Sequence, residues 1–261
     1  MDGMDDTALL SLAADLARRA GAVILAVRAR GFETLRKSDR SPVTEADHTA
    51  ETLILEGLRT ATPGIPVVAE EEMAAGHVPD DHHTYWLVDP LDGTREFAAG
   101  SDEFTVNIGL VRDGRAVLGA VGVPAYGELF GGILGATPGG TRTWKRSTAG
   151  ERAIRARVPP ANGLHVLASR AGAADPRLQG FLAGRTVADV THMGSALKVV
   201  RLAEGAADLY PRFGRMMEWD TAAPQAVLEA AGGQMLLMDG SAMRYGKPRW
   251  ENPGFVCTGR V

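Results

Sequence analysis

The chain has 261 residues, a length that can bury a sizeable hydrophobic core without disulfides. Hydrophobic residues make up 45% and charged residues 23%, which is ordinary for a globular protein and excludes a disordered or fibrous chain. The formal net charge of -4 argues against a nucleic acid polymer or a membrane surface as partner, because both attract a basic face, and leaves a small anionic ligand open.

Two helices are predicted in the first quarter of the chain. Apolar residues recur with a helical period from Thr7 to Arg30, and Gly31 ends this run. A polar segment, residues 37–47, then leads into a second helix that Thr62-Pro63-Gly64 ends. Catalytic residues are often found on such loops, which makes the polar segment a candidate for chemistry.

Short β-rich runs follow, and they predict neighbouring strands of one mixed or antiparallel sheet. These runs cover residues 65–70, 84–90, 104–111 and 116–124, with Asp113-Gly114 as a hairpin turn and 131–140 as a Gly-rich hairpin beyond it. The acidic stretch from Glu71 to His83 has no period and predicts a surface loop.

The alternation of elements restarts after Pro159-Pro160, which predicts a second lobe. Strands are expected at 163–169, 186–192, 207–211 and 233–239, and helices at about 178–182, 195–204 and 221–231. The prediction is an N-terminal α+β lobe over residues 1–158 and a C-terminal α/β lobe over residues 159–261. Periodicity alone supports a mixed α/β enzyme and no narrower fold.

The cysteine count and the N-terminal pattern bear on location. Cys257 is the single cysteine, so it cannot form an intramolecular disulfide, and it fits a small buried residue in a reducing compartment. The N-terminus is acidic and lacks the pattern of a secretory signal, and no segment approaches the roughly 20 apolar residues of a membrane span. The chain is therefore predicted to be cytoplasmic and to have no membrane span.

Acidic residues stand where several predicted elements end or begin: Glu70, Asp89, Asp92 and Asp220. Each one alone is better explained as a helix cap or a solvated charge. The segment VDPLDGT is less ordinary, because Asp89 and Asp92 flank a proline-fixed turn and can face one point. Two carboxylates that close repel each other, so either one is protonated or a cation compensates. Mg²⁺ prefers oxygen ligands of this kind, and the Leu91 carbonyl between them offers another.

The same segment also suits a phosphate group. Gly93 and Thr94 open a short predicted helix, TREF, whose free N–H groups favour an anionic oxygen. Glycine at position 93 permits the close backbone approach that such a contact needs. A metal site and a phosphate site would then be contiguous.

These motifs resemble the signature set of the inositol monophosphatase-like superfamily of lithium-sensitive phosphatases. The matching parts are DPLDGT with Phe97, Glu70-Glu71 upstream, WDTAA downstream and the loop motif SPVTEAD. The runs EFTVNIGL and GSALKVVRLAEGAADLYPRFG are more similar to the bacterial 3'(2'),5'-bisphosphate nucleotidases of that family. The resemblance covers nearly the whole chain and implies an α+β/α/β layered (αβαβα) sugar-phosphatase-like fold, with mixed sheets and the metal site between two lobes.

The resemblance also implies the cofactor and its ligands. Glu70, Asp89 and the Leu91 carbonyl would bind one Mg²⁺. Asp89, Asp92 and Asp220 would bind a second Mg²⁺, and a third ion near Glu70 stays open.

The expected catalytic residues are Asp47, Thr94 and Glu70. By resemblance, Asp47 and Thr94 would orient and deprotonate the attacking water, although a helix N-terminal carboxylate is the alternative reading of Asp47. Direct attack by a metal-activated water, with no phosphoenzyme, is the expected mechanism.

Substrate binding is expected to involve both lobes. The expected contacts are Glu70, Asp92, Gly93, Thr94, Ser195, Lys198, Arg212 and Asp220, with Gly194, Tyr210 and Ser169-Arg170 as further candidates. Lys198 and Arg212 could pair with the second phosphate of a bisphosphorylated nucleotide, and solvated surface charges are an equal alternative. Two residues depart from the family pattern without removing a ligand: Ala69 and Pro224. Pro224 is expected in the first turn of a helix, where proline is compatible with helical structure.

The leading function implied by the resemblance is magnesium-dependent hydrolysis of 3'-phosphoadenosine 5'-phosphate to AMP and phosphate, a step of sulfur metabolism. The first alternative is an inositol or sugar monophosphatase of broad specificity, which needs only one phosphate on its substrate. The second alternative is a non-catalytic nucleotide-binding regulatory protein. The loss of an acidic metal ligand would favour this alternative. A small phosphate ester is the expected partner, and a homodimer stays open because no interface is legible in the sequence.

Overall fold

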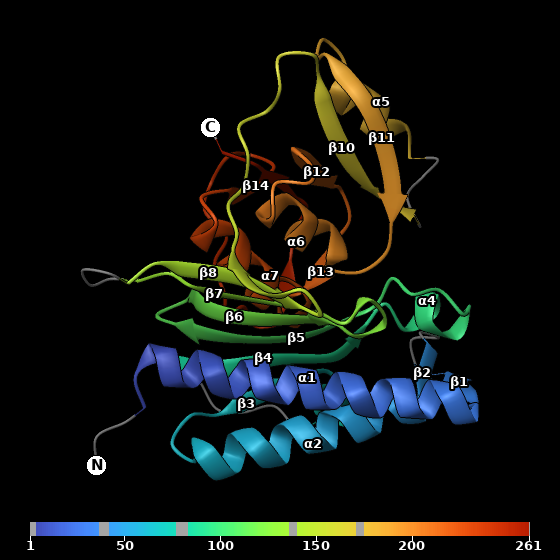
Figure 1. The fold of residues 1–261 in the computed structure, drawn as a ribbon, viewed down its shortest axis with the longest axis vertical. Coiled ribbons are helices and arrows are strands. Elements are labelled where there is room, and N and C mark those ends of the chain that lie inside the picture. The colour runs from blue at the N-terminus through green and yellow to red at the C-terminus, as the bar shows by residue number, and fades with distance from the viewer. Residues whose placement is uncertain (1–3, 37–41, 77–82, 136–139, 171–174, 261) are drawn as a thin grey trace.

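Helices and sheets alternate in layers in the computed structural model, which describes residues 4–36, 42–76, 83–135, 140–170 and 175–260. Helices α1 (Asp6–Arg30) and α2 (Glu45–Ala61) cover one face of a seven-stranded sheet (Figure 1). Helices α6 (Leu197–Ala203) and α7 (Glu218–Ala230) lie on its other side, and a five-stranded sheet and α5 (Pro176–Leu182) lie beyond them. The predicted layered αβαβα fold with mixed sheets is confirmed.

The seven-stranded sheet belongs to the N-terminal half of the chain and has the strand order β3-β4-β5-β6-β7-β8-β9. Strand β3 is parallel to β4, and every other pairing in this sheet is antiparallel. The strands are β3 (Val67–Ala69), β4 (Thr84–Asp92), β5 (Thr105–Arg112), β6 (Arg115–Val123), β7 (Glu128–Ile133), β8 (Arg142–Ser147) and β9 (Gly150–Ala153). The strands expected between residues 65 and 124 and the hairpin at Asp113-Gly114 are therefore confirmed.

The five-stranded sheet has the order β11-β10-β12-β16-β14. Its strands are β10 (Leu164–Ser169), β11 (Val187–Met193), β12 (Leu209–Arg212), β14 (Gln234–Leu237) and β16 (Phe255–Thr258). Two smaller sheets pair β1 (Thr34–Arg36) with β2 (Pro42–Thr44), and β13 (Met216–Met217) with β15 (Glu251–Asn252). The remaining elements are α3 (Glu70–Ala74), α4 (Thr94–Ala98) and the 3₁₀ helix η1 (Pro124–Tyr126). The predicted boundary between residues 158 and 159 lies in the connection from β9 to β10.

Three local predictions were wrong or incomplete. The polar segment 37–47 is not all loop, because Pro42–Thr44 form β2 and α2 begins at Glu45; residues 37–41 lie outside the described residues. The predicted loop from Glu71 to His83 begins inside helix α3, and residues 77–82 lie outside the described residues. Helix α7 begins at Glu218, so Pro224 stands inside the helix and not in its first turn.

Local sequence explains where the two N-terminal helices begin. The Asp5 side chain accepts a hydrogen bond from the Ala8 amide at 2.7 Å and caps α1. Thr44 and Asp47 form a reciprocal capping box at the start of α2, which satisfies amides that the first turn leaves without partners. Apolar side chains of both helices then pack on the seven-stranded sheet and form one of two hydrophobic clusters. The other cluster fills the space around α6, α7 and the five-stranded sheet.

A row of three glycines brings α7 close to the seven-stranded sheet. Gly109, Gly119 and Gly132 are cross-strand neighbours on β5, β6 and β7. A Cβ atom added to any of them would lie under 3.0 Å from backbone atoms of Ala223 or Val227 in α7. The helix backbone therefore rests on the sheet backbone, at a depth that any larger side chain would prevent.

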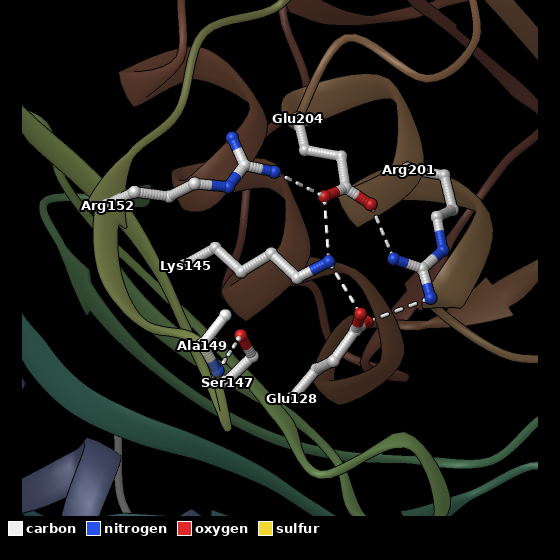
Figure 2. Close-up of polar contacts among 7 residues, drawn as sticks. All are labelled: Glu128, Lys145, Ser147, Ala149, Arg152, Arg201 and Glu204. Carbon is white, nitrogen blue, oxygen red and sulfur yellow. Dashed lines mark hydrogen bonds and ion pairs between the residues drawn. The ribbon is translucent and has the colours of Figure 1, made fainter.

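A cluster of ion pairs joins the seven-stranded sheet to α6 (Figure 2). Lys145 of β8 contacts Glu128 at 2.5 Å and Glu204 at 2.8 Å. Arg201 of α6 binds the same two glutamates, and Arg152 of β9 adds a contact to Glu204 at 3.1 Å. The cluster therefore connects elements that precede residue 158 with elements that follow it.

No helix in the described parts of the chain is long and apolar enough to span a membrane.

Candidate active site

One cavity of about 540 Å³ brings the predicted site residues together. The predicted residues that line it are Glu70, Asp89, Leu91, Asp92, Gly93, Thr94, Ser195, Lys198, Arg212 and Asp220, with the further candidates Ser169, Gly194 and Tyr210. Asp47 lies behind Thr94 and hydrogen-bonds to it. Arg170 instead pairs with Glu103 at 2.6 Å, so its guanidinium is engaged away from the cavity lining.

The end of strand β4 turns Asp89 and Asp92 toward the cavity. The pairing of β4 with β5 is irregular between these two residues, where Pro90 cannot donate a ladder hydrogen bond. The Asp89 carboxylate accepts a hydrogen bond from the Leu91 amide at 2.9 Å, which fixes the turn between them. This irregularity lets two carboxylates from one strand line the same cavity.

Asp92 also links β4 to α6. Its carboxylate accepts hydrogen bonds from the Ala196 amide at 2.5 Å and from the Thr105 hydroxyl at 3.3 Å. Burial raises the pKa of Asp92, and the Lys198 ammonium and the Ala196 amide oppose that shift. Asp92 thus connects the candidate metal site with the residues expected to hold substrate.

Asp220 reaches the cavity from the first turn of α7. Its carboxylate accepts a hydrogen bond from the Met217 amide at 3.2 Å, so it caps the helix that carries it. Pro224 has no amide to donate to the Asp220 carbonyl one turn earlier, so this carbonyl lacks its usual helical partner. Because the three glycines allow α7 to approach the seven-stranded sheet closely, they also affect how near Asp220 lies to that sheet.

The carboxylates are too crowded to carry full negative charge without a compensating cation. Burial, followed by the nearby acidic side chains, raises the pKa of both Asp89 and Asp220 well above the ordinary aspartate range. Among the described residues, no three His, Cys, Asp or Glu side chains already converge on one point. The donor set nevertheless fits a hard cation such as Mg²⁺, because it consists of carboxylate and carbonyl oxygens around one cavity.

Thr94 and Asp47 form the hydrogen-bonded pair that the sequence predicts. The Thr94 hydroxyl lies 2.9 Å from Asp47 Oδ1 and 3.1 Å from the Leu91 carbonyl oxygen. Asp47 Oδ2 accepts hydrogen bonds from the Thr44 amide and hydroxyl, each at 2.7 Å. Asp47 is therefore both a helix cap and the partner of Thr94, so the two readings of this residue are compatible.

Gly93 allows a tight approach between the two halves of the site. Its φ of 94° is left-handed, and an added Cβ would lie 3.0 Å from the Glu103 carbonyl oxygen. The same Cβ would lie 3.3 Å from the Ser195 Cβ. Glycine at this position keeps the segment after β4 against the start of α6.

The basic side of the cavity is formed by Lys198 and Arg212. Lys198 is 4% exposed, and its Nζ donates to the carbonyls of Met193 at 3.1 Å and Ser195 at 2.6 Å. An ammonium has three donors, so one remains for a ligand. Burial lowers the pKa of Lys198 to about 8, although Asp92 opposes the shift. Arg212 donates to the Ser169 hydroxyl at 3.3 Å, and its Nε has no partner among the described residues.

Two further cationic side chains line the cavity, Arg95 and Arg215, which sequence reasoning did not single out. Arg95 directly follows the predicted phosphate segment, and that position was the available signal. Arg215 pairs with Glu251 at 2.7 Å, and nothing in the sequence brings those two residues together. Both arginines are exposed, and they add positive charge to a cavity that is also lined by acidic residues.

The chain is similar to known phosphatases over nearly its whole length. The model of the inositol monophosphatase family matches residues 5–259. The chain is 42% identical over 256 residues to the 3'(2'),5'-bisphosphate nucleotidase CysQ of Salmonella typhimurium, covering 96% of this chain and 99% of that protein. It is 34% identical to the 3'-phosphoadenosine 5'-phosphate phosphatase of Mycobacterium leprae, covering 94% and 87%. The solved structure of CysQ from Bacteroides thetaiotaomicron superposes with a TM-score of 0.79 at 30% identity, covering 97% of both chains.

Proposed function

The chain belongs to the inositol monophosphatase family, and on that premise we propose that it is a magnesium-dependent 3'(2'),5'-bisphosphate nucleotidase. Its reaction is hydrolysis of 3'-phosphoadenosine 5'-phosphate to AMP and phosphate. The observation that carries the proposal is one cavity that is lined both by Lys198 and Arg212 and by the proposed metal ligands Glu70, Asp89, Asp92 and Asp220. Such a cavity suits a ligand with one phosphate on the cation side and a second phosphate on the basic side.

Glu70, Asp89, Asp92, Asp220 and the Leu91 carbonyl are the proposed magnesium ligands. When bound, Mg²⁺ would neutralise the phosphate, lower the pKa of the attacking water and stabilise the leaving oxygen. Two or three ions are expected, and Asp89 is proposed to be shared between two of them. A bound cation would offset the burial and the repulsion between acidic side chains that raise the pKa of Asp89 and Asp220.

Thr94 and Asp47 are proposed to move the proton of the attacking water. When the Thr94 hydroxyl donates to Asp47 Oδ1 at 2.9 Å, its lone pairs are free to accept a proton from water in the cavity. The two contacts from Thr44 keep the Asp47 carboxylate in place during this transfer. Water then attacks phosphorus in line with the departing 3'-oxygen, without a phosphoenzyme.

The amides of Gly93 and Thr94 are proposed to contact the non-bridging oxygens of the transferred phosphate. These oxygens gain negative charge in the transition state, so fixed N–H donors lower the barrier electrostatically. Glu70 and Asp220 would contribute as ligands of the cation, which would supply further positive charge to the reacting phosphate.

The second phosphate is proposed to bind Lys198, Arg212 and Ser195. Lys198 retains one donor, and the Arg212 Nε is unpaired among the described residues. A monophosphate would leave the remaining Lys198 donor and the Arg212 Nε without a phosphate oxygen to bind, so it should bind less tightly than a bisphosphate. The structure therefore favours a bisphosphate over an inositol or sugar monophosphate.

Phosphate release from 3'-phosphoadenosine 5'-phosphate and from inositol 1-phosphate, measured side by side with Mg²⁺ and with added lithium, tests this proposal. We expect strong preference for the nucleotide, AMP as the product and inhibition by lithium. Preference for the inositol ester would instead identify a broad monophosphatase. No release from either substrate would point to a non-catalytic nucleotide-binding protein. The cytoplasmic location and a homodimer stay predictions.

A further inference from the structure

Glu51 is a buried acidic residue next to the candidate active site that the mechanism above does not use. It lies on α2, four residues after Asp47, and residues spaced in this way share one face of a helix. The side chain is 4% exposed and Asp47 is 1% exposed, so this face of α2 is buried against the rest of the protein. A buried carboxylate is costly to desolvate unless its contacts compensate.

The contacts of Glu51 are made with the backbone that follows Glu70. Glu51 Oε2 accepts the Glu71 amide at 2.8 Å, and Oε1 accepts the Glu72 amide at 2.9 Å. These are the second and third residues of α3, and Glu70 is the first. Both oxygens of one carboxylate therefore hold the peptides directly after a proposed magnesium ligand.

Ala69 explains why this contact comes from another helix. It occupies the N-cap position of α3, where a Ser, Thr, Asp or Asn side chain would normally bind these amides. Alanine has no acceptor, and Glu51 supplies the missing cap from α2 across 20 residues of sequence. Burial raises the pKa of Glu51 to about 7, and the hydrogen bonds from the Glu71 and Glu72 amides oppose that shift.

We propose that Glu51 is a positioning residue for the metal site, a role that rests on the proposed function. By binding the amides of Glu71 and Glu72, it fixes the orientation of the Glu70 carboxylate toward the cavity. Because Asp47 lies on the same face of α2, this helix also sets the distance between Glu70 and the Asp47–Thr94 pair. One rigid element thus aligns a metal ligand with the groups that move the proton.

Magnesium binding by Glu51→Ala and Glu51→Gln, compared with the wild type, tests the proposal directly. Titration calorimetry of Mg²⁺ without substrate gives a readout that is independent of turnover. We expect about 10- to 100-fold weaker Mg²⁺ binding for Glu51→Ala, the range seen when groups behind metal ligands are removed. Glu51→Gln keeps one acceptor oxygen, and we expect an intermediate loss. The KM for the nucleotide at saturating Mg²⁺ should change little, because Glu51 does not line the cavity.

Glu204→Gln is the matched control, because Glu204 is another buried carboxylate and lies in the ion-pair cluster of Figure 2. It should lower the melting temperature and leave Mg²⁺ binding unchanged. Equal Mg²⁺ affinity in the Glu51 variants and the wild type would overturn the positioning role. If Glu51→Ala does not fold, the Mg²⁺ affinity of Glu51→Gln decides the question. Wild-type protein that binds no Mg²⁺ would overturn the proposed function itself, which separates the two failures.

Discussion

At the scale of single residues, the hydrogen bond between Thr94 and Asp47 is a structural contact whose proposed catalytic role can be tested. Asp47 accepts hydrogen bonds from the Thr44 amide and hydroxyl and from the Thr94 hydroxyl. Asp47→Asn should lower kcat about 100-fold or more, because an amide cannot take up a proton at this position. Its Mg²⁺ half-saturation should stay near the wild-type value. Steady-state kinetics at several Mg²⁺ concentrations checks this, and a kcat within a few-fold of wild type would exclude the proton relay.

Lys198 gives a prediction about pH. Burial lowers its pKa to about 8, so its positive charge is present below that pH and is lost as the pH rises through it. If this charge binds the second phosphate, the KM for 3'-phosphoadenosine 5'-phosphate should rise between about pH 7 and pH 9.

Adenosine 3'-phosphate is the matched control substrate, because it lacks only the 5'-phosphate. Loss of the Lys198 charge should not raise the KM for this substrate over the same pH range. In Lys198→Ala, the difference in KM between the two substrates should become smaller and should no longer depend on pH. An equal pH response for both substrates would assign Lys198 to holding the carbonyls of Met193 and Ser195 alone.

The sequence indicates that residues share a cavity most directly where the chain itself holds them close together. Asp89 and Asp92 are three residues apart, so their shared direction follows from the local turn. Glu51 and Arg215 could not be found in this way, because their roles depend on partners distant in sequence. The i, i+4 relation between Asp47 and Glu51 was the available signal for Glu51.

At the scale of elements, helix α7 depends on the glycine row beneath it. Gly119→Ala should push α7 away from the sheet and lower the free energy of unfolding by about 1–3 kcal/mol, the usual cost of overpacking. The shift would also move Asp220, so Mg²⁺ affinity should fall. Chemical denaturation and Mg²⁺ titration check both effects.

Gly180→Ala is the control, because an added Cβ in α5 meets no atom within 4 Å. Alanine favours a helix over glycine by about 0.5–1 kcal/mol, so this variant should be as stable as the wild type or more so. If Gly119→Ala were equally harmless, the close approach would not determine the position of α7.

The elements that the sequence predicted are those with a strong apolar pattern. Helices α1 and α2 each bury an apolar face, and strands β4 to β6 are nearly continuous buried runs. Strand β9 was missed because its residues are all exposed and carry no alternation. Helix α7 starts earlier than expected because Met217 is at its N-cap and Asp220 supplies the cap, so the usual Ser or Thr signal is absent.

At the scale of the whole molecule, the ion-pair cluster of Figure 2 joins the sheet of the N-terminal half to α6. Although burial alone would raise it, the pKa of Glu204 is lowered, because Lys145 and Arg201 favour its charged form. A lowered pKa contributes stability at neutral pH that is lost as the pH falls through the acidic range.

Glu204→Gln should therefore reduce stability at neutral pH by about 3 kcal/mol, because it removes one of the two carboxylates that pair with Lys145 and Arg201. The difference from the wild type should shrink as the pH is lowered. Denaturant unfolding at several pH values measures this. A constant difference at every pH would contradict an electrostatic origin.

The layered fold as a whole was predictable only through resemblance to a family. Hydrophobic periodicity indicated alternating helices and strands, but it could not order the strands of two sheets. Strand β16, for example, lies between β12 and β14 although it is the last strand in the chain. Such long-range pairings are set by tertiary packing, which local patterns do not encode.

The rate of phosphate release from 3'-phosphoadenosine 5'-phosphate as a function of Mg²⁺ concentration tests the central claim most directly. Chelator-treated wild-type protein, Asp89→Asn and Asp208→Asn should be compared. Asp208 is a buried aspartate paired with Arg157 away from the cavity and serves as the control. We predict no turnover without Mg²⁺, a saturable rise for the wild type and Asp208→Asn, and no activity for Asp89→Asn. Turnover without metal, or near-normal activity of Asp89→Asn, would contradict the account.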